Sequence, residues 1–159
     1  MEKVLLITPT YNEAENIQKF IDFTKTFEEL HLLVVDDNSP DCTAEIVEKN
    51  MQSSDSVKII KRSGKLGYGS AIIEGYKWGL ENNYYHFVQM DTDFSHRFED
   101  LTKLINEKNN YDLVIGSRYV HRGGTTGWPK RRQYLSKYAN KLCGLVFKSE
   151  INDQTSGFR

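Results

Sequence analysis

The sequence predicts an α/β fold, with a parallel, doubly wound sheet that carries helices on both faces. Short runs of aliphatic and β-branched residues recur, and each is followed by a stretch with apolar residues at helical spacing. That alternation is typical of βαβ units, whose strands pair in parallel. Polar groups follow the ends of the runs, where the ligands of such sheets bind. A length of 159 residues suits one domain, so we assign residues 1–159 to a single domain.

The predicted strands are the apolar runs at 4–8, 32–35, 57–60, 85–90 and 113–115. The first, Val4–Thr8, is continuous, as expected of a strand that is buried on both faces. All of the runs are of strand length and shorter than a typical helix. We therefore expect parallel strands whose carboxyl ends meet at one edge of the sheet.

The predicted helices follow these strands, and two of them have predicted caps. Asn12 is the expected N-cap of the first helix, with Glu15 three residues later. Ser39 is expected to cap the second helix, with Pro40 at its first position. Further helices are expected over 71–78, over 98–104 and, after an aperiodic loop at 121–129, over 131–147.

Composition excludes some classes of protein. A formal net charge of −1 lacks the basic footprint of a general nucleic-acid binder. No uninterrupted apolar stretch is long enough to span a bilayer, and the first residues do not read as a signal peptide. Cys42 and Cys143 lack metal-type spacing and are interpreted as free thiols of a reducing compartment. We expect the cytoplasm or the cytoplasmic face of a membrane.

The acidic triplet Asp91-Thr92-Asp93 follows the apolar run at 85–90. Carboxylates at i and i+2 of an extended chain project to the same side, where they repel unless a cation lies between them. A hard divalent metal with oxygen ligands is the natural occupant. Turns and helix caps also favour aspartate, so the triplet alone does not settle the matter. His96, three residues further on, is a possible supporting group.

Two other segments at strand ends have open interpretations. Asp37 belongs either to a capped turn or to a nucleotide site, since acidic residues at this place bind ribose hydroxyls in other α/β folds. The glycine-rich segment 64–70 lacks the ending of a phosphate loop and is favoured as a tight turn into a helix. A helix N-terminus there can still assist an anion.

Positive charge is concentrated between residues 118 and 141. Arg118 follows the run at 113–115, and Arg131 and Arg132 open the last predicted helix, one turn before Ser136. A solvated helix face is the ordinary interpretation of such a run. Arginine also binds phosphate with two parallel hydrogen bonds, however, so the asymmetry indicates an anionic partner.

Six motifs occur along the chain, at Thr8–Glu13, Asp36–Asp41, Gly64–Gly69, Asp91–His96, Gly116–Tyr119 and Asp153–Arg159. They stand in the order found in glycosyltransferase family 2, and the chain resembles the dolichyl-phosphate (polyprenyl-phosphate) mannosyltransferases of that family. The resemblance covers the whole chain, and the combined set is specific although each part alone is not. It implies the GT-A type of Rossmann-like, mostly parallel sheet with helices on both faces.

The resemblance implies an activity: inverting transfer of mannose from GDP-mannose to a polyprenyl (dolichyl) monophosphate, with Mg²⁺ or Mn²⁺ as cofactor. It also implies a peripheral location at the cytosolic face of a membrane, the endoplasmic reticulum in a eukaryote or the plasma membrane in a prokaryote. Attachment to the membrane surface is expected through a further C-terminal part or a partner subunit. No nucleic-acid partner is expected.

The same resemblance implies roles for individual residues. Asp91, Asp93 and Arg118 are the implied catalytic residues, and Asp93 and Ser95 the implied metal ligands. Arg118, Arg132 and Ser136 are expected to bind the acceptor phosphate, with Arg131 as the alternative to Arg132. The nucleotide-sugar site is expected to comprise Pro9, Tyr11, Glu13, Val35, Asp37, Asp91, Thr92, Asp93 and Arg118.

The chain departs from the family pattern at three places. Cys42 stands where glycine is usual, and Thr92 replaces the common alanine between the carboxylates. The chain also ends at Arg159, the last residue of the final motif, so we expect a catalytic domain truncated at its C-terminus. Two other functions remain open. One is a UDP-glucose-dependent polyprenyl-phosphate glucosyltransferase, and the other is a catalytically silent domain that binds nucleotide sugars.

Overall fold

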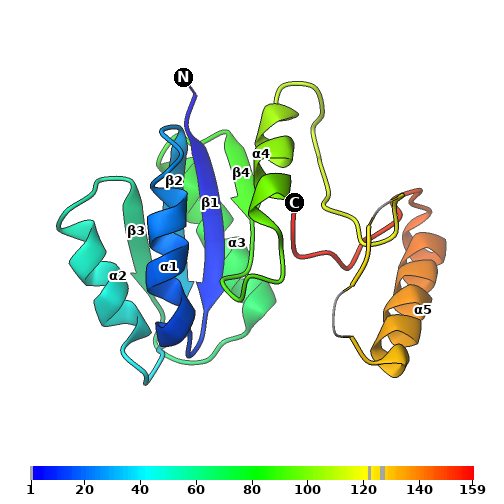
Figure 1. Cartoon of the computed structure of the whole chain (residues 1–159), viewed down its shortest axis with the longest axis horizontal. Helices are drawn as coiled ribbons and strands as arrows, with labels where there is room; N and C mark the ends of the chain where they lie inside the picture. Colours follow the sequence, from blue (N-terminus) through cyan, green and yellow to red (C-terminus); the bar gives the residue numbers. More distant parts are fainter. Residues whose placement is uncertain (1, 122, 126–127) are drawn as a thin grey trace.

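The computed structural model describes residues 2–121, 123–125 and 128–159, and it contains a four-stranded parallel sheet in the order β3-β2-β1-β4 (Figure 1). The expected loop at 121–129 includes residues 122 and 126–127, which lie outside the described part. The strands are β1 (Val4–Thr10), β2 (Leu30–Asp36), β3 (Val57–Lys61) and β4 (His86–Gln89). The helices are α1 (Ala14–Thr24), α2 (Thr43–Met51), α3 (Tyr68–Glu81), α4 (Phe98–Asn106) and α5 (Lys130–Phe147).

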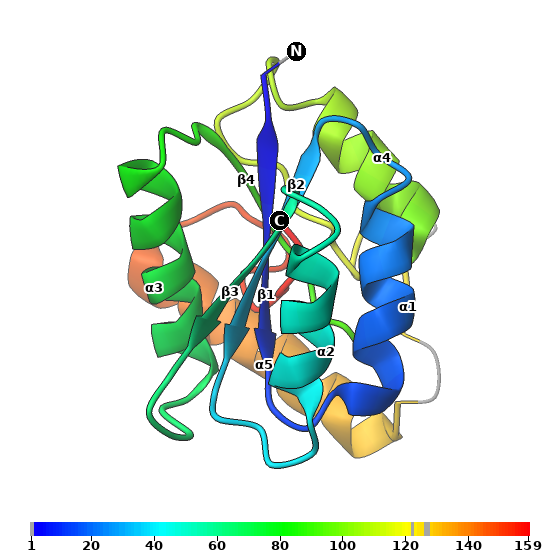
Figure 2. The same ribbon diagram turned by 90° about the vertical axis from the view of Figure 1, so that its left-hand side faces the viewer.

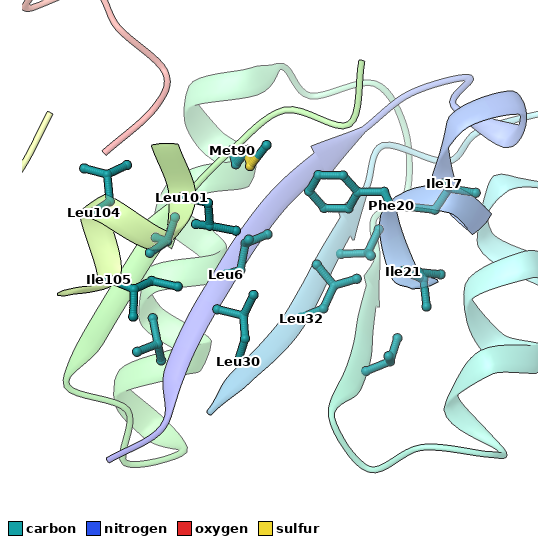
Figure 3. Packing of buried hydrophobic residues seen from close by; sticks show 14 of the residues in the cluster. Leu6, Ile17, Phe20, Ile21, Leu30, Leu32, Met90, Leu101, Leu104 and Ile105 are labelled. Carbon is teal, nitrogen blue, oxygen red and sulfur yellow. The ribbon is translucent and has the colours of Figure 1, made fainter. Parts of the chain in front are cut away.

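Helices cover both faces of the sheet, as predicted (Figure 2). On one face, Leu6 and Val34 of the strands join the buried residues of α1, α2 and α4 in a single cluster (Figure 3). On the other face, Leu5 and Leu33 pack with α3. Successive residues of a strand point to opposite faces, so a strand covered on both sides must be apolar throughout. The continuous run in β1 therefore reflects its central place in the sheet.

Helix α3 lies unusually close to the sheet because it presents glycines to it. A Cβ atom on Gly75 would lie 2.5 Å from Ile7 Cγ2, and one on Gly79 would lie 2.7 Å from Leu5 Cδ2. Neither space admits a methyl group without displacement of the strand side chains. These two glycines are therefore required by the packing of α3, which also positions the start of that helix at the carboxyl edge of the sheet.

The predicted strand at 113–115 is absent from the described structure, which corrects the expectation of a fifth strand. The last residues of the chain lie beside β4 instead. Arg159 and Gln89 exchange both backbone hydrogen bonds, at 2.7 and 3.3 Å, and the Gly116 N–H donates to the Phe158 carbonyl. The segment at 113–116 is therefore separated from β4 by the chain terminus, and it has a single ladder-type bond where a strand needs several.

Both predicted helix caps are wrong in detail. Ser39 and Pro40 precede α2, because the Ser39 N–H and hydroxyl both donate to the Asp36 carboxylate and hold a turn there. Cys42 precedes α2 with φ of 68°. Glu13 rather than Asn12 is the N-cap of α1, and Asn12 has φ of 62°. The free N–H groups at the start of α1 are bound by the other loop, with the Ala14 N–H donating to Asp41 Oδ2 at 2.9 Å.

Helix α5 lies apart from the sheet (Figure 1). Among its residues, all of which are described, Asn140 alone is buried. Its amide donates to Thr155 Oγ1 at 2.9 Å, so polar contacts with the C-terminal segment position the helix. Within the described residues, no helix combines the length and the apolar character that crossing a membrane requires.

Candidate active site

The carboxyl ends of β1, β2 and β4 bring the predicted nucleotide residues to one edge of the sheet. Pro9 of β1 lies in register with Val35 of β2, and Asp91 follows β4 on the other side of β1. The strand order reverses between β1 and β4, which is the place where open α/β sheets bind ligands. Val35 is fully buried, backbone included, so it lies beneath the surface at this edge of the sheet.

Asp36 and Asp37 have different environments. The Asp36 carboxylate is 1% exposed and accepts a hydrogen bond of 2.7 Å from Thr10 Oγ1, which ties the ends of β1 and β2 together. Asp37 is 6% exposed and is paired with Arg62, whose Nη1 lies 2.5 Å from Oδ1. The other oxygen accepts from the Gly67 N–H at 2.8 Å. Asp37 therefore also anchors the glycine-rich turn, in addition to any contact with a ligand.

The glycine-rich segment is a turn into α3, as predicted. Gly67 has φ of 97°, a conformation that side chains rarely adopt, and immediately precedes the helix. Arg62 also donates to Ser70 Oγ at 2.7 Å, which fixes the first turn of the helix. Exposed Lys65 extends from this turn over the Tyr11 ring, with Nζ 3.8 Å from the ring centroid. The turn thus supplies a cation next to a predicted nucleotide residue.

Asp91 is partly exposed and lies among polar groups from three segments. Its Oδ2 is 3.7 Å from His96 Nε2, and it neighbours the hydroxyl of Tyr68 at the start of α3. Burial of the phenol, followed by the negative charge of Asp91, raises the pKa of Tyr68 to about 12. Tyr68 therefore stays protonated and can donate a hydrogen bond to this carboxylate.

Asp93 and Ser95 face solvent in the loop after β4. The Ser95 N–H donates to Asp93 Oδ1 at 3.0 Å, which holds the two residues close together. Thr92 between the two aspartates is buried, so the loop turns inward there. Within the described residues, no three His, Cys, Asp or Glu side chains lie close enough together to hold a metal ion by themselves. Carboxylate and hydroxyl oxygens nevertheless fit Mg²⁺ or Mn²⁺, because such ions are commonly held by one or two carboxylates together with substrate phosphates.

Arg118 is bound to a buried carboxylate. Its Nε and Nη2 donate to the two oxygens of Asp153 at 2.8 and 2.5 Å, and the Asp153 side chain is fully buried. Burial alone would raise the pKa of Asp153, but the hydrogen bonds from Arg118 outweigh it and lower that pKa. The same pair raises the pKa of Arg118. Arg118 is therefore held in place, with part of its guanidinium still exposed.

Trp128 lies against two of the predicted acceptor-binding arginines. The Arg132 guanidinium carbon is 3.9 Å from the ring centroid, and that of Arg118 is 5.1 Å away. Ser136 accepts a hydrogen bond of 2.8 Å from the Tyr119 hydroxyl. This arrangement favours Arg132 over Arg131 as the partner of Arg118. Both guanidinium groups thus lie near the same indole ring, and guanidinium groups suit the binding of a phosphate.

The segment Asp153–Arg159 connects the two groups of residues. Asp153 binds Arg118 at one end, while Gly157 lies next to Tyr68 and Asp91 at the other. A Cβ atom on Gly157 would lie 2.8 Å from the Tyr68 hydroxyl and 3.6 Å from Asp91 Oδ2. The acidic loop and the arginine cluster are therefore attached to the same seven-residue segment.

Sequence reasoning singled out none of four residues that shape this site. Arg62 follows the end of β3, so the rule about carboxyl ends of strands could have identified it. Lys65 and Tyr68 lie within the glycine-rich segment. The glycines of that segment predict a backbone turn but indicate no role for these two side chains. Trp128 carries no signal in the sequence, because its importance arises from arginines four and ten residues away.

Comparison with known sequences gives relatives over nearly the whole chain. A polyprenol monophosphomannose synthase of Mycolicibacterium smegmatis is 39% identical over 99% of this chain and 61% of its own length. An undecaprenyl-phosphate mannosyltransferase of Micrococcus luteus is 37% identical over 99% of this chain and 65% of its own. A dolichol-phosphate mannosyltransferase of Pyrococcus furiosus is 40% identical over 98% of this chain and 45% of its own length. The chain thus spans about half to two thirds of the length of these relatives.

Solved structures with the same fold include two glycosyltransferases of the GT-A type. Mannosyltransferase PcManGT of Pyrobaculum calidifontis, in complex with GDP-Man and Mn²⁺, superposes with a TM-score of 0.54 at 23% identity, over 72% of this chain and 34% of that protein. TarS of S. aureus superposes with a TM-score of 0.55 at 24% identity, over 80% of this chain and 24% of that protein. These likenesses confirm the predicted fold class. The sequence profile of glycosyl transferase family 2 matches residues 5–159, and the chain belongs to that family.

Proposed function

We propose that this chain carries the donor site and part of the acceptor site of an inverting mannosyltransferase, which transfers mannose from GDP-mannose to a polyprenyl monophosphate such as dolichyl phosphate. One observation carries the proposal: the segment Asp153–Arg159 joins an acidic loop suited to a metal-bound diphosphate to an arginine cluster suited to a second phosphate. The names of the relatives support mannose as the sugar and a polyprenyl phosphate as the acceptor.

The residues at the edge of the sheet have separate tasks in this reaction. Pro9, Tyr11, Glu13 and Asp37 would surround the nucleoside, with buried Val35 beneath them. Asp91, Thr92 and Asp93 would face the diphosphate, and Lys65 adds a positive charge on the side of Tyr11. Arg118 and Arg132, with Ser136 nearby, would hold the phosphate of the acceptor against Trp128.

The chemistry requires positioning more than proton transfer. An oxygen of the acceptor phosphate attacks the anomeric carbon of mannose, and the bond from that carbon to the diphosphate breaks with its electron pair leaving on GDP. The attacking oxygen is already ionised at neutral pH, so a strong general base is unnecessary. Most of the remaining rate enhancement comes from holding the two phosphates at the right separation.

Asp93 and Ser95, with the backbone contact between them, would hold Mg²⁺ or Mn²⁺. The ion would supply charge neutralisation of the departing diphosphate.

A polyprenyl phosphate resides in a membrane, so we place the enzyme at the cytosolic face of one. Both cysteines, which belong to the described part of the chain, are free thiols.

Transfer of radiolabelled mannose from GDP-mannose to dolichyl phosphate tests the reaction, with Mg²⁺ or Mn²⁺ and then with EDTA. We expect labelled lipid only when the metal is present. Calorimetric titration of the donor tests the binding half separately, because it needs no acceptor. Asp93→Asn should weaken metal-dependent donor binding by at least about tenfold, since a contact to a charged group is worth roughly 1.5 kcal/mol or more.

The control is Asp22→Asn on an exposed position of α1, which should bind the donor like the native protein. Tighter binding of UDP-glucose than of GDP-mannose would replace the sugar assignment with the glucosyltransferase. Donor binding without transfer, in a chain extended to the length of its relatives, would favour the silent binding domain. Unchanged metal-dependent binding by the Asp93 variant would refute the metal assignment.

A further inference from the structure

The Tyr68 hydroxyl connects two side chains at the carboxyl end of β4. Gln89 Nε2, from the last residue of that strand, donates a hydrogen bond of 2.8 Å to the phenol oxygen. The hydroxyl in turn donates to the Asp91 carboxylate. An amide nitrogen only donates, a carboxylate only accepts and a phenol has a single proton, so the direction of both bonds is determined. A relay of hydrogen bonds therefore runs from Gln89 through Tyr68 to Asp91.

The first two members of this relay belong to regular elements. Gln89 is in register with Ile7 of β1 on one side, and its backbone exchanges hydrogen bonds with Arg159 on the other. Tyr68 is the first residue of α3, whose glycines pack closely on the sheet. Asp91 lies instead in the irregular loop after β4, outside any helix or strand. The relay therefore ties a loop side chain to two rigid elements.

The Asp91 carboxylate is held on one side and open on the other. Its Oδ2 lies 3.7 Å from His96 Nε2 and would lie 3.6 Å from a Cβ atom on Gly157. The same Cβ atom would lie 2.8 Å from the Tyr68 hydroxyl, so glycine at position 157 leaves the hydroxyl room to reach Asp91. The Asp91 side chain is nevertheless 36% exposed. The carboxylate can therefore meet a ligand while the protein fixes its orientation.

We propose that Tyr68 is a positioning residue for the sugar donor, because its hydroxyl orients the Asp91 carboxylate towards the bound nucleotide sugar. The inference rests on the proposed function, in which Asp91 faces the donor. Tyr68 itself is 46% exposed and contributes little to the core, so we assign its role to the hydroxyl rather than to the ring. A carboxylate that is already oriented loses less conformational freedom when the donor binds, so its contact with the donor is stronger.

Calorimetric titration with GDP-mannose and Mn²⁺ tests the role of the hydroxyl. Tyr68→Phe keeps the ring and should weaken donor binding about three- to tenfold, because the Asp91 carboxylate loses the hydrogen bond that orients it. The loss should appear in Kd with the stoichiometry unchanged, whereas a variant that merely unfolds would bind donor at fewer sites. Asp91→Asn should weaken binding by more than about tenfold, since it removes a charged contact.

The double variant shows whether Tyr68 acts through Asp91. Tyr68→Phe together with Asp91→Asn should bind the donor no more weakly than Asp91→Asn alone, because the hydroxyl then has no carboxylate to orient. Urea denaturation of the same four proteins requires no donor. The shifts in the urea midpoint should likewise fail to add, as expected of two partners in one hydrogen bond.

The matched control is Tyr76→Phe, which removes a hydroxyl from the same helix. Tyr76 lies eight residues after Tyr68, about 12 Å further along α3, with its ring edge-on to Phe87 of β4. Its replacement should leave donor binding unchanged. Unchanged binding by Tyr68→Phe, an equal loss in Tyr76→Phe, or losses that add in the double variant would overturn the role of Tyr68.

The two proposals fail in different ways. A native protein that binds no nucleotide sugar would refute the proposed function and the role of Tyr68 with it. Normal binding by the native protein, together with additive losses in the variants, would refute the role of Tyr68 alone.

Discussion

Buried charges at the carboxyl edge of the sheet are paired inside the protein. Arg62 and Asp37 have side chains that are 4% and 8% exposed, and their hydrogen bonds extend to Gly67 and Ser70. A buried ion pair adds little net stability, but loss of one partner leaves the other uncompensated. The pair therefore fixes the position of Asp37 and of the turn that carries Lys65.

Arg62→Ala should lower the free energy of unfolding by about 3–5 kcal/mol, because Asp37 would remain buried without a counter-charge. Urea denaturation followed by circular dichroism measures the change. Lys61→Ala is the neighbouring control, since Lys61 pairs with Glu48 at the surface and should cost less than about 1 kcal/mol. Equal losses from the two variants would show that the internal network has no special importance.

Cys42 occupies a left-handed backbone conformation, with φ of 68°, which glycine adopts more readily than residues with a side chain. A side chain in this conformation costs roughly 1–2 kcal/mol, part of which glycine recovers despite its more flexible unfolded state. Cys42→Gly should therefore raise stability by about 0.5–1 kcal/mol. Thermal denaturation provides the measurement, and Cys42→Ser, which keeps the Cβ atom, should give no gain.

Most elements could be predicted because their signals are local. The runs in β1, β2 and β3 and the apolar spacing in α1, α3 and α4 do not depend on distant residues. The segment at 113–115 was predicted wrongly because its neighbour in space is the chain terminus, more than forty residues away, and no local pattern reports that. The Ser39 cap failed for a local reason, because the Asp36 carboxylate, three residues earlier, accepts hydrogen bonds from its hydroxyl and its N–H.

For the candidate site too, the sequence predicts what depends on strand order but not what depends on tertiary packing. Topology alone brings Pro9, Asp37 and Asp91 to one edge of the sheet, because parallel strands end together. The capture of Arg118 by Asp153, 35 residues further along the chain, depends on tertiary packing and has no counterpart in residue spacing. Sequence patterns therefore identified the loops that carry the site, while its internal contacts came from the structure.

Helix α3 allows a test of element packing with an internal control. Gly79→Ala should destabilise the protein by about 1–3 kcal/mol, because its methyl group would overlap Leu5 and Phe87 of the sheet. Gly69→Ala lies in the same helix, with nothing within 4 Å of the new methyl group, and should be neutral or stabilising by up to about 1 kcal/mol. Denaturant midpoints of the two variants measure the difference. Similar midpoints would contradict the close approach of α3 to β1.

At the scale of the whole molecule, Arg118 and Asp153 attach the segment before α5 to the segment that follows that helix. The lowered pKa of Asp153 gives the sign of a pH effect. A carboxyl group with a lower pKa in the folded state stabilises the protein above its unfolded pKa, and that contribution is lost as pH falls through the folded value. Acidification should therefore weaken this attachment.

Asp153→Asn should lower stability by about 3 kcal/mol at neutral pH, where the native carboxylate is ionised and Arg118 would lose its counter-charge. The difference from the native protein should begin to narrow below about pH 4, where the unfolded state takes up its proton, and should be lost as pH falls through the lower pKa of the folded state. Urea titrations at a series of pH values measure it. Asp22→Asn, at the surface, should differ from the native protein by less than about 0.5 kcal/mol throughout. A gap for Asp153→Asn that stays constant with pH would contradict the ionised pair.

The segment Asp153–Arg159 sets the separation of the two regions that we propose bind phosphate. Its length sets how far the arginines lie from the acidic loop, with Asp153 fixed to Arg118 and Arg159 fixed to Gln89. One added residue would shift one end relative to the other by up to about 3.5 Å, the reach of one residue in an extended chain. Each region would keep its own ligand contacts, but a nucleophile aligned for attack would no longer face its carbon.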